Sequence, residues 1–269
     1  MGVVTADIVG QDHTVVLADI RQDRLDEAVV TLKGAGIDAT PVHCDVTDRE
    51  SVERLFAAAS GLGRIASVIN TAGVSPSMGD ADYVMRTNAL GTLNVNEAFY
   101  ANAGEGAAIV NVASMASYLM PEAMLPTQHF DLAFTDEQRF IAELLAACEL
   151  GPEEIRSGLA YGISKNFVRW YCTSQAERFT ARGLRVVSVS PGSVDTEMGR
   201  LEADAGAGAI VANAAVPRWG TPREMAELFA FCASDRAGYL TGTDILNDGG
   251  VVASVRERAR LAAKAETDS

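Results

Sequence analysis

The amino-acid sequence predicts an α/β fold, a doubly wound parallel sheet (Rossmann-like) with helices on both faces. Short β-branched runs alternate along the chain with segments of helical periodicity, the pattern of strand–helix–strand units. The runs are apolar throughout, as expected of parallel strands buried on both sides. The 269 residues show no break in composition, so we expect one domain over residues 1–250, followed by a tail at 251–269.

The predicted elements follow one another in regular order. We expect strands at 2–5, 14–19, 40–44, 65–70, 107–113, 184–190 and 243–246. Helices are expected at 23–33, 82–100 and 161–182, after the capping residue Asp48, and after Thr221-Pro222, a pair that suits a helix start. The carboxyl ends of the strands share one edge of such a sheet, and we expect the ligand crevice there.

Composition excludes several classes of partner. The net charge of −14 argues against nucleic acid and anionic membrane surfaces, because both would repel the chain. No apolar run approaches a membrane span and no signal peptide is recognisable, which favours a cytoplasmic protein. Four scattered cysteines and three histidines, none at metal-ligand spacing, predict reduced, mostly buried thiols and no metal site.

A tyrosine and a lysine stand four residues apart in the segment Tyr161-Gly-Ile-Ser-Lys165, which we expect in the first turn of a helix. This spacing places both side chains on one helix face. Lys33 and Lys264 are the only other lysines, and most basic positions are arginine. The position therefore favours a compact ammonium, which can stabilise an ionised phenol beside it.

Polar or small residues follow several predicted strands. Asp19 ends the second strand, where a carboxylate can bind the ribose hydroxyls of NAD and repel the 2′-phosphate of NADP. Arg21 weakens that preference, and Asp19 is alternatively a plain strand-end acid. Asp45-Val46, Asn70–Gly73 and Ser114 also follow strands, and each is either part of the crevice or an ordinary turn.

These residues occur along the chain in a fixed order: Asp19, Asp45, Asn70–Gly73, Asn88, Ser114, Tyr161, Lys165 and Pro191-Gly192. In this order the chain resembles the classical short-chain dehydrogenase/reductase family over residues 2–250. Asn70–Gly73 is similar to the family's N-N-A-G stretch with Thr71 for the second asparagine, and Asn247–Gly250 is similar to its closing D-G-G.

The resemblance implies four catalytic roles. Tyr161 would be the general acid/base, and Lys165 would lower the pKa of Tyr161 and hold the nicotinamide ribose. Ser114 would steady the substrate oxygen, and Asn88 would join a water-linked proton relay. A phenol with a pKa near 10 is a reluctant proton donor and acceptor at neutral pH, which is why the chemistry needs a neighbouring ammonium and the positive nicotinamide ring.

The resemblance also implies NAD as the cofactor, with NADP less expected. Its binding residues would be Asp19, Asp45, Val46, Asn70, Ala72, Gly73, Tyr161, Lys165, Pro191, Gly192, Val194 and Thr196.

The first departure from the family lies at the start of the chain. The family's glycine-rich phosphate loop is missing between the first two strands, where Gly10 is the only glycine. The segment from Thr5 to Thr14 is too short for a full crossover helix, so no helix start is expected to receive the pyrophosphate. Alternatively, residues 6–11 are the tail of that helix.

The second departure is an insertion at about 119–158, which separates Ser114 from Tyr161. Thr135–Gln138 is a capping-box pattern that predicts a helix through Leu150. Short-chain enzymes similar to 3α-hydroxysteroid dehydrogenase/carbonyl reductase carry an insertion here, which favours a steroid-like or other bulky apolar substrate. The inserted helix would cover the substrate mouth or alter a subunit contact, or alternatively be a passive elaboration. Residues 201–217 stand where the family has a mobile substrate lid, although their many alanines could equally form an ordered helix.

Two functions remain open on the sequence. The first is an NAD-dependent enzyme that interconverts a secondary alcohol and a ketone, both small molecules. The alternative is a non-catalytic binding or scaffold protein that has lost the dinucleotide. The resemblance further implies a homodimer or homotetramer paired through the helices that begin near Asp82 and Tyr161.

Overall fold

The computed structural model describes residues 1–203 and 208–267 of the chain. The strands are β1 (Val15–Asp19), β2 (Ala39–His43), β3 (Ser67–Asn70), β4 (Ala108–Val112), β5 (Arg185–Pro191) and β6 (Asp244–Asn247). The α-helices are α1 (Gly2–Val9), α2 (Gln22–Gly34), α3 (Arg49–Leu62), α4 (Ala81–Met85), α5 (Gly91–Asn102), α6 (Ala116–Leu119), α7 (Glu137–Glu149), α8 (Arg156–Ser174), α9 (Ala176–Thr180), α10 (Glu197–Glu202), α11 (Gly208–Ala212), α12 (Pro222–Ala233) and α13 (Val251–Thr267). The predicted alternation of strands and helices is confirmed, apart from the first element.

The described strands pair in parallel, but they form two sheets. β1 pairs with β2, and β3, β4, β5 and β6 form a second sheet in that order. The predicted sheet is therefore divided between β1 and β3, which do not pair with each other in the described part of the chain. The carboxyl ends of neighbouring strands still share an edge, which is where the sequence placed the crevice.

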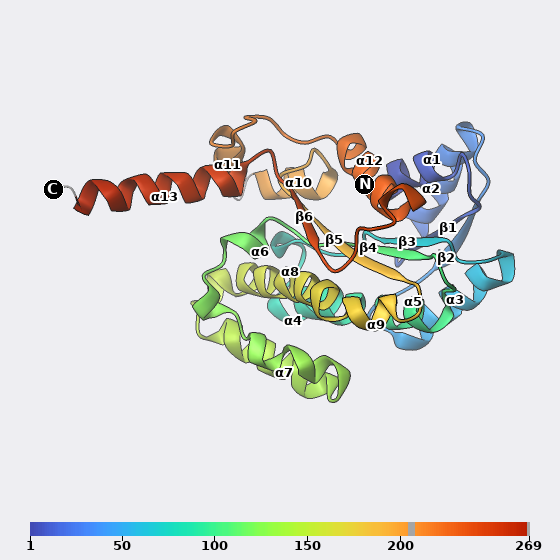
Figure 1. Ribbon diagram of the computed structural model, residues 1–269, viewed down its shortest axis with the longest axis horizontal. Coiled ribbons are helices and arrows are strands. Elements are labelled where there is room, and N and C mark those ends of the chain that lie inside the picture. Colours follow the sequence, from blue (N-terminus) through green and yellow to red (C-terminus); the bar gives the residue numbers. More distant parts are fainter. Residues whose placement is uncertain (204–207, 268–269) are drawn as a thin grey trace.

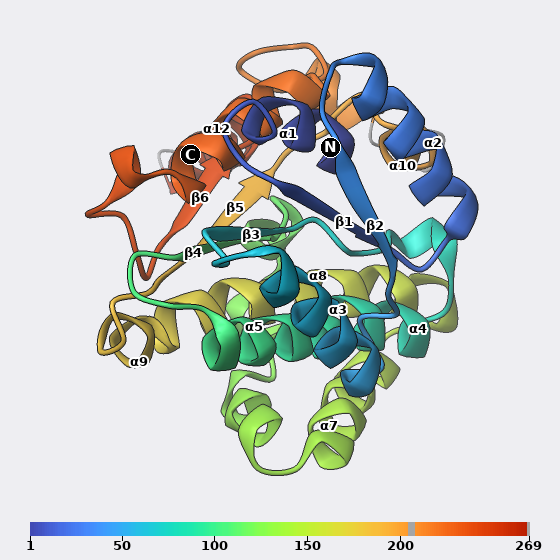
Figure 2. The same ribbon diagram turned by 90° about the vertical axis from the view of Figure 1, so that its right-hand side faces the viewer.

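Helices cover both faces of the strands, as Figures 1 and 2 show. α12 packs on β3, β4 and β5, and α1 packs on α12. On the opposite face α5 and α8 pack on β4, and α4 packs on α8. The largest hydrophobic cluster lies on this second face and includes the fully buried Phe99, Ile109 and Phe167.

The expectation of a strand at Gly2–Thr5 is wrong, because this segment begins α1. Thr5 and Ala6 are buried, and Asp7 lies 3.4 Å from Arg223 of α12. β-branched residues disfavour a helix only weakly, so packing against α12 decides the local structure. The alternative, a short crossover helix ending near residue 11, is closer to the structure, although the helix begins earlier than expected. The first helix is short, with eight residues.

Two helices differ in detail from the prediction. α8 begins at Arg156, so Tyr161 lies in its second turn rather than its first. The helix expected at 82–100 is interrupted by a π-helical turn, Arg86–Leu90, between α4 and α5. π-helical turns within helices are frequent at functional sites, and this one contains Asn88.

The insertion forms α7 and packs into the main core. Its capping residue is Asp136 rather than Thr135, and the Asp136 carboxylate accepts a hydrogen bond from the Arg139 N–H at 3.0 Å. Phe140 and Leu144 are fully buried in the main hydrophobic cluster. α7 packs on α8 and α4, on the side away from the sheet in Figures 1 and 2. An effect of α7 on the substrate mouth or on a subunit contact stays a prediction.

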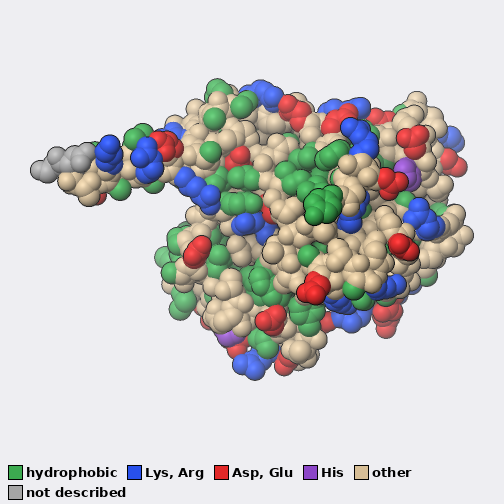
Figure 3. All heavy atoms as spheres, in the orientation of Figure 1, with side chains coloured by type: hydrophobic (Ala, Val, Ile, Leu, Met, Phe, Trp, Pro, Cys, Tyr) green, Lys and Arg blue, Asp and Glu red, His purple; other side chains and the backbone are tan. Residues whose placement is uncertain are grey.

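The last helix, α13, projects from the body of the molecule in Figure 1. Its first turn is anchored, because the Asp248 carboxylate accepts hydrogen bonds from the N–H groups of Gly250 and Val252 at 2.8 Å. Basic side chains stand on the projecting part in Figure 3. The sequence of α13 contains Arg256, Arg258, Arg260 and Lys264.

Two regions singled out in the sequence are described only in part. Residues 204–207, inside the expected lid, lie outside the described residues, with α10 and α11 on either side. Residues 268–269 of the tail also lie outside them. None of the described helices combines the length and the apolar character needed to cross a membrane.

Candidate active site

Tyr161 and Lys165 share one face of α8, as their spacing predicts. The Lys165 ammonium nitrogen lies 5.8 Å from the centroid of the Tyr161 ring. It donates a hydrogen bond of 2.8 Å to the Val112 carbonyl oxygen at the end of β4. Lys165 is only 5% exposed, so this contact fixes a buried ammonium between the helix and the strand.

Ser114 follows β4 and reaches the same place. Its hydroxyl accepts a hydrogen bond from the Ala116 N–H at 3.2 Å. The next residue, Met115, donates its N–H to the Pro191 carbonyl oxygen at 2.9 Å, which ties the turn to the end of β5. The Ser114 hydroxyl also lies near enough to the Tyr161 phenol to act on its pKa, and this interaction favours the ionised phenol. The structure therefore brings Ser114, Tyr161 and Lys165 together, as predicted.

The pKa values of this group do not follow the sequence expectation. Burial raises the pKa of Tyr161, and the interaction with Ser114 offsets only part of the rise. Burial lowers the pKa of Lys165 to about 8. In the protein alone, desolvation therefore outweighs the stabilising effect that the ammonium was expected to have on the ionised phenol.

Asn88 and Gly73 pack beside Lys165. The fully buried Asn88 amide donates to the Val74 carbonyl oxygen and accepts from the Val74 N–H, each at 2.9 Å. A Cβ atom on Gly73 would lie 3.0 Å from Asn88 Oδ1 and 3.2 Å from Lys165 Nζ. The Asn88 side chain thus holds the loop after β3, and a role in a proton relay stays a prediction.

Asp19 and Asp45 lie at the adjacent ends of β1 and β2. Asp19 is partly exposed, and its carboxylate accepts a hydrogen bond from the Arg21 N–H at 2.9 Å. The Asp45 carboxylate accepts from both the N–H and the hydroxyl of Thr47 at 2.8 Å. The next carbonyl, that of Val46, accepts from the Asn94 amide at 2.9 Å. These residues lie together at the carboxyl ends of the two-stranded sheet, and their role in cofactor binding stays a prediction.

The stretch Asn70–Gly73 is divided between the interior and the edge. The Asn70 amide donates to Asn111 Oδ1 at 3.1 Å, and Asn111 donates to Asn96 Oδ1 at 2.9 Å. Asn70 therefore serves a buried amide network, whereas Ala72 is exposed at the edge.

The residues after β5 border a pocket of about 190 Å³ whose lining includes Gly192, Val194 and Asp248. A Cβ atom on Gly192 would lie 2.7 Å from Asp248 Cα, so this position requires glycine. The buried Pro191 ends β5. The Thr196 hydroxyl caps α10 by accepting the Gly199 N–H at 3.0 Å, which places it at the helix start.

The start of α1 also reaches this edge. A Cβ atom on Gly2 would lie 3.0 Å from the Thr71 hydroxyl oxygen, so the first turn of α1 stands beside the loop after β3. The expectation that no helix start is present here is therefore wrong, because the segment expected to be a strand is the helix itself.

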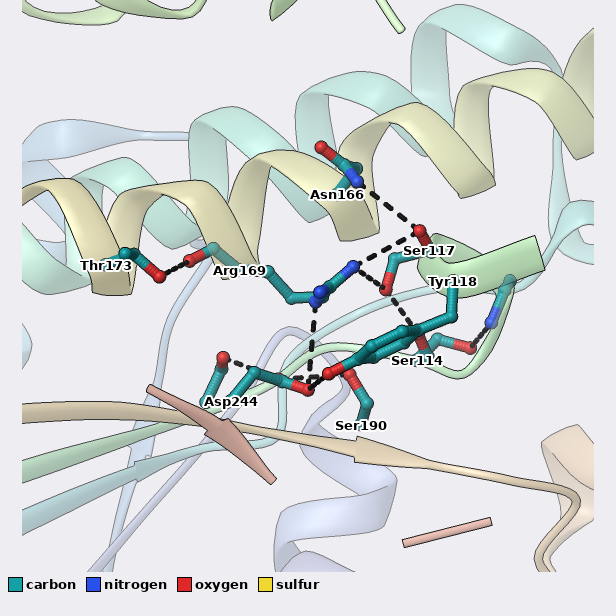
Figure 4. Close-up of polar contacts among 10 residues, drawn as sticks. Ser114, Ser117, Tyr118, Asn166, Arg169, Thr173, Ser190 and Asp244 are labelled. Atoms are coloured by element: carbon teal, nitrogen blue, oxygen red, sulfur yellow. Dashed lines mark hydrogen bonds and ion pairs between the residues drawn. The ribbon is translucent and has the colours of Figure 1, made fainter. Parts of the chain in front are cut away.

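Sequence reasoning missed a polar group next to Ser114. Asp244 begins β6 with a side chain only 5% exposed, and it contacts Tyr118 and Arg169 (Figure 4). A carboxylate inside a run predicted to be a buried strand is a signal that could have been used, because a buried charge requires partners. Within the described residues, His, Cys, Asp and Glu side chains form no group of three suited to a metal ion.

Comparisons with known proteins agree with this geometry. The family described as short chain dehydrogenase matches residues 2–127, and the one described as Enoyl-(Acyl carrier protein) reductase matches residues 145–252. The short-chain dehydrogenase/reductase bsc3 of Alternaria brassicicola is 30% identical over 259 residues, which cover 94% of this chain and 92% of that protein. Dehydrogenase/reductase SDR family member 4 of Bos taurus is 28% identical over 249 residues, covering 88% and 77% respectively.

A solved structure supports the fold. The short-chain dehydrogenase/reductase from Serratia marcescens BCRC 10948 superposes with a TM-score of 0.73 over 93% of each chain, at 20% identity. The fold, the sequence matches and the family order of the site residues lead to one conclusion: the chain belongs to the short-chain dehydrogenase/reductase family and is an oxidoreductase that acts on CH–OH groups.

Proposed function

We propose that the protein is an NAD(H)-dependent oxidoreductase that interconverts a secondary alcohol and a ketone. The observation that carries the proposal is the buried Lys165 ammonium, which lies 5.8 Å from the Tyr161 ring and is bonded to the end of β4, the strand that leads into Ser114. The two hydroxyl groups of Ser114 and Tyr161, with the positive charge of Lys165 nearby, can stabilise a carbonyl oxygen that gains negative charge during the reaction.

The described residues fit a nicotinamide dinucleotide, the cofactor type of this family. An ammonium has three N–H donors, and Lys165 directs one of them to Val112, which leaves others for ribose hydroxyls. Gly73 keeps the approach to Lys165 open, since a Cβ atom there would crowd the ammonium at 3.2 Å. The start of α1 beside Thr71 offers the positive end of a helix to the pyrophosphate.

Each residue has a separate task in the proposed reduction. When bound beside Lys165, NADH would supply the hydride that reduces the carbonyl carbon. The Tyr161 hydroxyl transfers its proton to the carbonyl oxygen, and the Ser114 hydroxyl holds that oxygen by a hydrogen bond. The Lys165 ammonium favours the phenolate that remains and holds the ribose hydroxyls. Asn88 keeps the loop that carries Gly73 in place through its two bonds to Val74.

The charges at the end of β1 support NAD rather than NADP as the cofactor. Asp19 presents a carboxylate where a 2′-phosphate would stand. Arg21 was expected to weaken this preference, but its Nε donates to Asp23 Oδ1 at 3.1 Å. The guanidinium is therefore already engaged with another carboxylate. We accordingly propose Asp19 as the residue that selects NAD.

A bulky apolar substrate, steroid-like or otherwise, is the proposed substrate class. Exposed apolar side chains occur on three segments near the site: Met78 (39% exposed), Leu119 (38%) and Leu201 (50%). The Ser77 N–H donates to Glu202 Oε1 at 3.3 Å, which brings two of these segments together. The Glu202 charge acts on Tyr161, so α10 lies within electrostatic range of the phenol.

Fluorescence titration with NADH, followed by turnover assays on apolar ketones, tests the proposal. We expect saturable binding and turnover, and Tyr161→Phe should lower kcat at least about 100-fold with NADH binding retained. Tyr83→Phe, at a half-exposed tyrosine of α4, is the matched control and should retain activity. Unchanged turnover in Tyr161→Phe contradicts the assignment. No binding at millimolar NADH would favour the non-catalytic alternative.

We also propose that the protein is cytoplasmic and that it forms a homo-oligomer. Cys44, Cys148, Cys172 and Cys232 are free and buried, in keeping with a reducing compartment. α7 packs on α4 and α8, the helices through which pairing was expected, so pairing there would have to accommodate the insertion. Light scattering of the purified chain measures the state, and a monomer contradicts the proposal.

A further inference from the structure

A buried carboxylate stands beside the turn that carries Ser114. Asp244 Oδ1 accepts hydrogen bonds from the hydroxyls of Ser188 at 2.6 Å and Ser190 at 3.0 Å. Asp244 Oδ2 accepts a hydrogen bond from the Tyr118 hydroxyl at 2.7 Å (Figure 4). A carboxylate is costly to bury unless it is hydrogen-bonded, so Asp244 holds the Tyr118 ring in one place.

Arg169 reaches the same group from α8. Its guanidinium carbon lies 3.5 Å from the centroid of the Tyr118 ring. Its Nη1 donates to the Ser117 carbonyl oxygen at 3.2 Å, and its Nε lies 3.7 Å from Asp244 Oδ2. That Nε is buried without a hydrogen-bond partner among the described residues, so stacking and charge hold the guanidinium in this position.

The held turn is the one that carries Ser114. The Ser117 hydroxyl donates to the Ser114 carbonyl oxygen at 2.7 Å, and Asn166 of α8 donates to the Ser117 carbonyl oxygen at 3.3 Å. Arg169 follows Tyr161 and Lys165 on the same helix face at successive spacings of four. α8, which carries the Tyr161 phenol, is therefore also hydrogen-bonded to the turn that carries the Ser114 hydroxyl.

We propose that Asp244, Tyr118 and Arg169 are positioning residues that set the Ser114 hydroxyl against the Tyr161 phenol. This inference rests on the proposed function and adds residues that touch neither substrate nor cofactor in it. Displacements on the order of 1 Å can cost about 100-fold in rate, so a rigid support is a catalytic requirement. Burial and Asp244 raise the pKa of Tyr118 to about 12, which keeps its hydroxyl a donor at working pH.

The chain contains a matched control for this network. Near the other end of α8, the Tyr171 hydroxyl donates to Glu97 Oε1 at 2.7 Å, and Arg178 pairs with Glu97 at 2.7 Å. Arg178 also stacks over the Tyr100 ring at 3.9 Å. The chemistry is the same, but these side chains do not contact the Ser114 turn. Tyr171→Phe therefore measures the loss of a phenol–carboxylate bond alone.

The first test needs neither cofactor nor substrate. The chain is labelled with 3-fluorotyrosine, which brings phenol titration to lower pH, and the Tyr161 signal is followed by fluorine NMR. Tyr118→Phe should raise the Tyr161 midpoint by roughly half a pH unit, because Ser114 loses its hold on the phenol. Tyr171→Phe should leave the midpoint unchanged. In a Ser114→Ala background, Tyr118→Phe should no longer shift the Tyr161 midpoint. A folded Tyr118→Phe with an unshifted midpoint overturns the inference.

The second test is kinetic. Tyr118→Phe should lower kcat about tenfold while leaving the KM for NADH unchanged, and Ser114→Ala should abolish this difference. Additive losses in the double variant overturn the inference, because Tyr118 would then act independently of Ser114. If the parent chain turns over no ketone, the proposed function fails, and the NMR titration still decides whether the network positions Ser114.

Discussion

The Lys165 ammonium donates a 2.8 Å hydrogen bond to the Val112 carbonyl oxygen, which fastens the helix that carries Tyr161 to the strand that ends beside Ser114. The same ammonium borders Gly73 from the loop after β3. One buried charge therefore connects three segments of the site. Its burial has consequences for stability as well as for chemistry, and both can be measured.

Lys165 should contribute a term to stability that rises with pH. Burial lowers the pKa of Lys165 from 10.5 to about 8, so between these values the unfolded chain holds a proton that the folded chain has released. The contribution of Lys165 to the free energy of unfolding should therefore increase by about 3 kcal/mol from pH 8 to pH 10.5, and it is lost again as pH falls from 10.5 to about 8. Urea unfolding of the parent chain and Lys165→Met across this range isolates the effect.

The free energy of unfolding of the parent chain should therefore gain about 3 kcal/mol relative to Lys165→Met across this range, because methionine has no proton to release. Lys33→Met, at an exposed position on α2, serves as the control and should follow the parent chain. Parallel pH profiles for the parent and Lys165→Met would contradict the prediction.

Gly73→Ala should damage the site more than the fold. The new Cβ atom would lie 3.0 Å from Asn88 Oδ1 and 3.2 Å from Lys165 Nζ, so one of these groups must move. We expect kcat to fall about tenfold, with a stability loss of roughly 1–3 kcal/mol. The control is Gly61→Ala in α3, where nothing lies within 4 Å of the new Cβ atom. It should stabilise the helix by about 0.5–1 kcal/mol and leave turnover intact. Equal turnover in both variants would show that Gly73 is not a close-approach position.

Local signals allowed much of the fold and site to be predicted. Asp48 and Thr221 cap α3 and α12 as expected, and the spacing of Tyr161 and Lys165 does place both on one face of α8. Such signals act over a few residues, where helix geometry alone decides which groups meet. The end of β4 was predictable in the same way, and with it the place of Ser114.

The remaining features depend on contacts that are distant in sequence. Gly2–Thr5 has the composition of a strand but is helical because it packs on α12. Tyr118 meets Asp244 across 126 positions, which no local pattern encodes. The pKa of Tyr161 likewise depends on how completely the fold removes water from the phenol, and the sequence shows only that an ammonium is near.

The preference for NAD should depend on Asp19. Its carboxylate lies at the end of β1, where it would repel a 2′-phosphate, so Asp19→Ser should lower the ratio of kcat/KM for NADH over NADPH by about tenfold or more. Asp38→Ser removes the same charge just before the opposite end of β2 and is the matched control. A ratio that moves equally in both variants would indicate a general charge effect rather than a contact at the ribose.

The insertion should behave as part of the core, because its buried side chains pack against α8. The Phe140 and Phe167 rings lie 4.8 Å apart between centroids, and Phe140 is fully buried. Phe140→Ala should therefore lower the free energy of unfolding by about 3–5 kcal/mol in urea titrations. Phe134→Ala is the control, since Phe134 is 39% exposed and loses less buried surface. Similar small losses in the two variants would mean that α7 is a passive attachment, whereas a large loss at Phe140 alone would make the insertion a structural support for the helix that carries Tyr161 and Lys165.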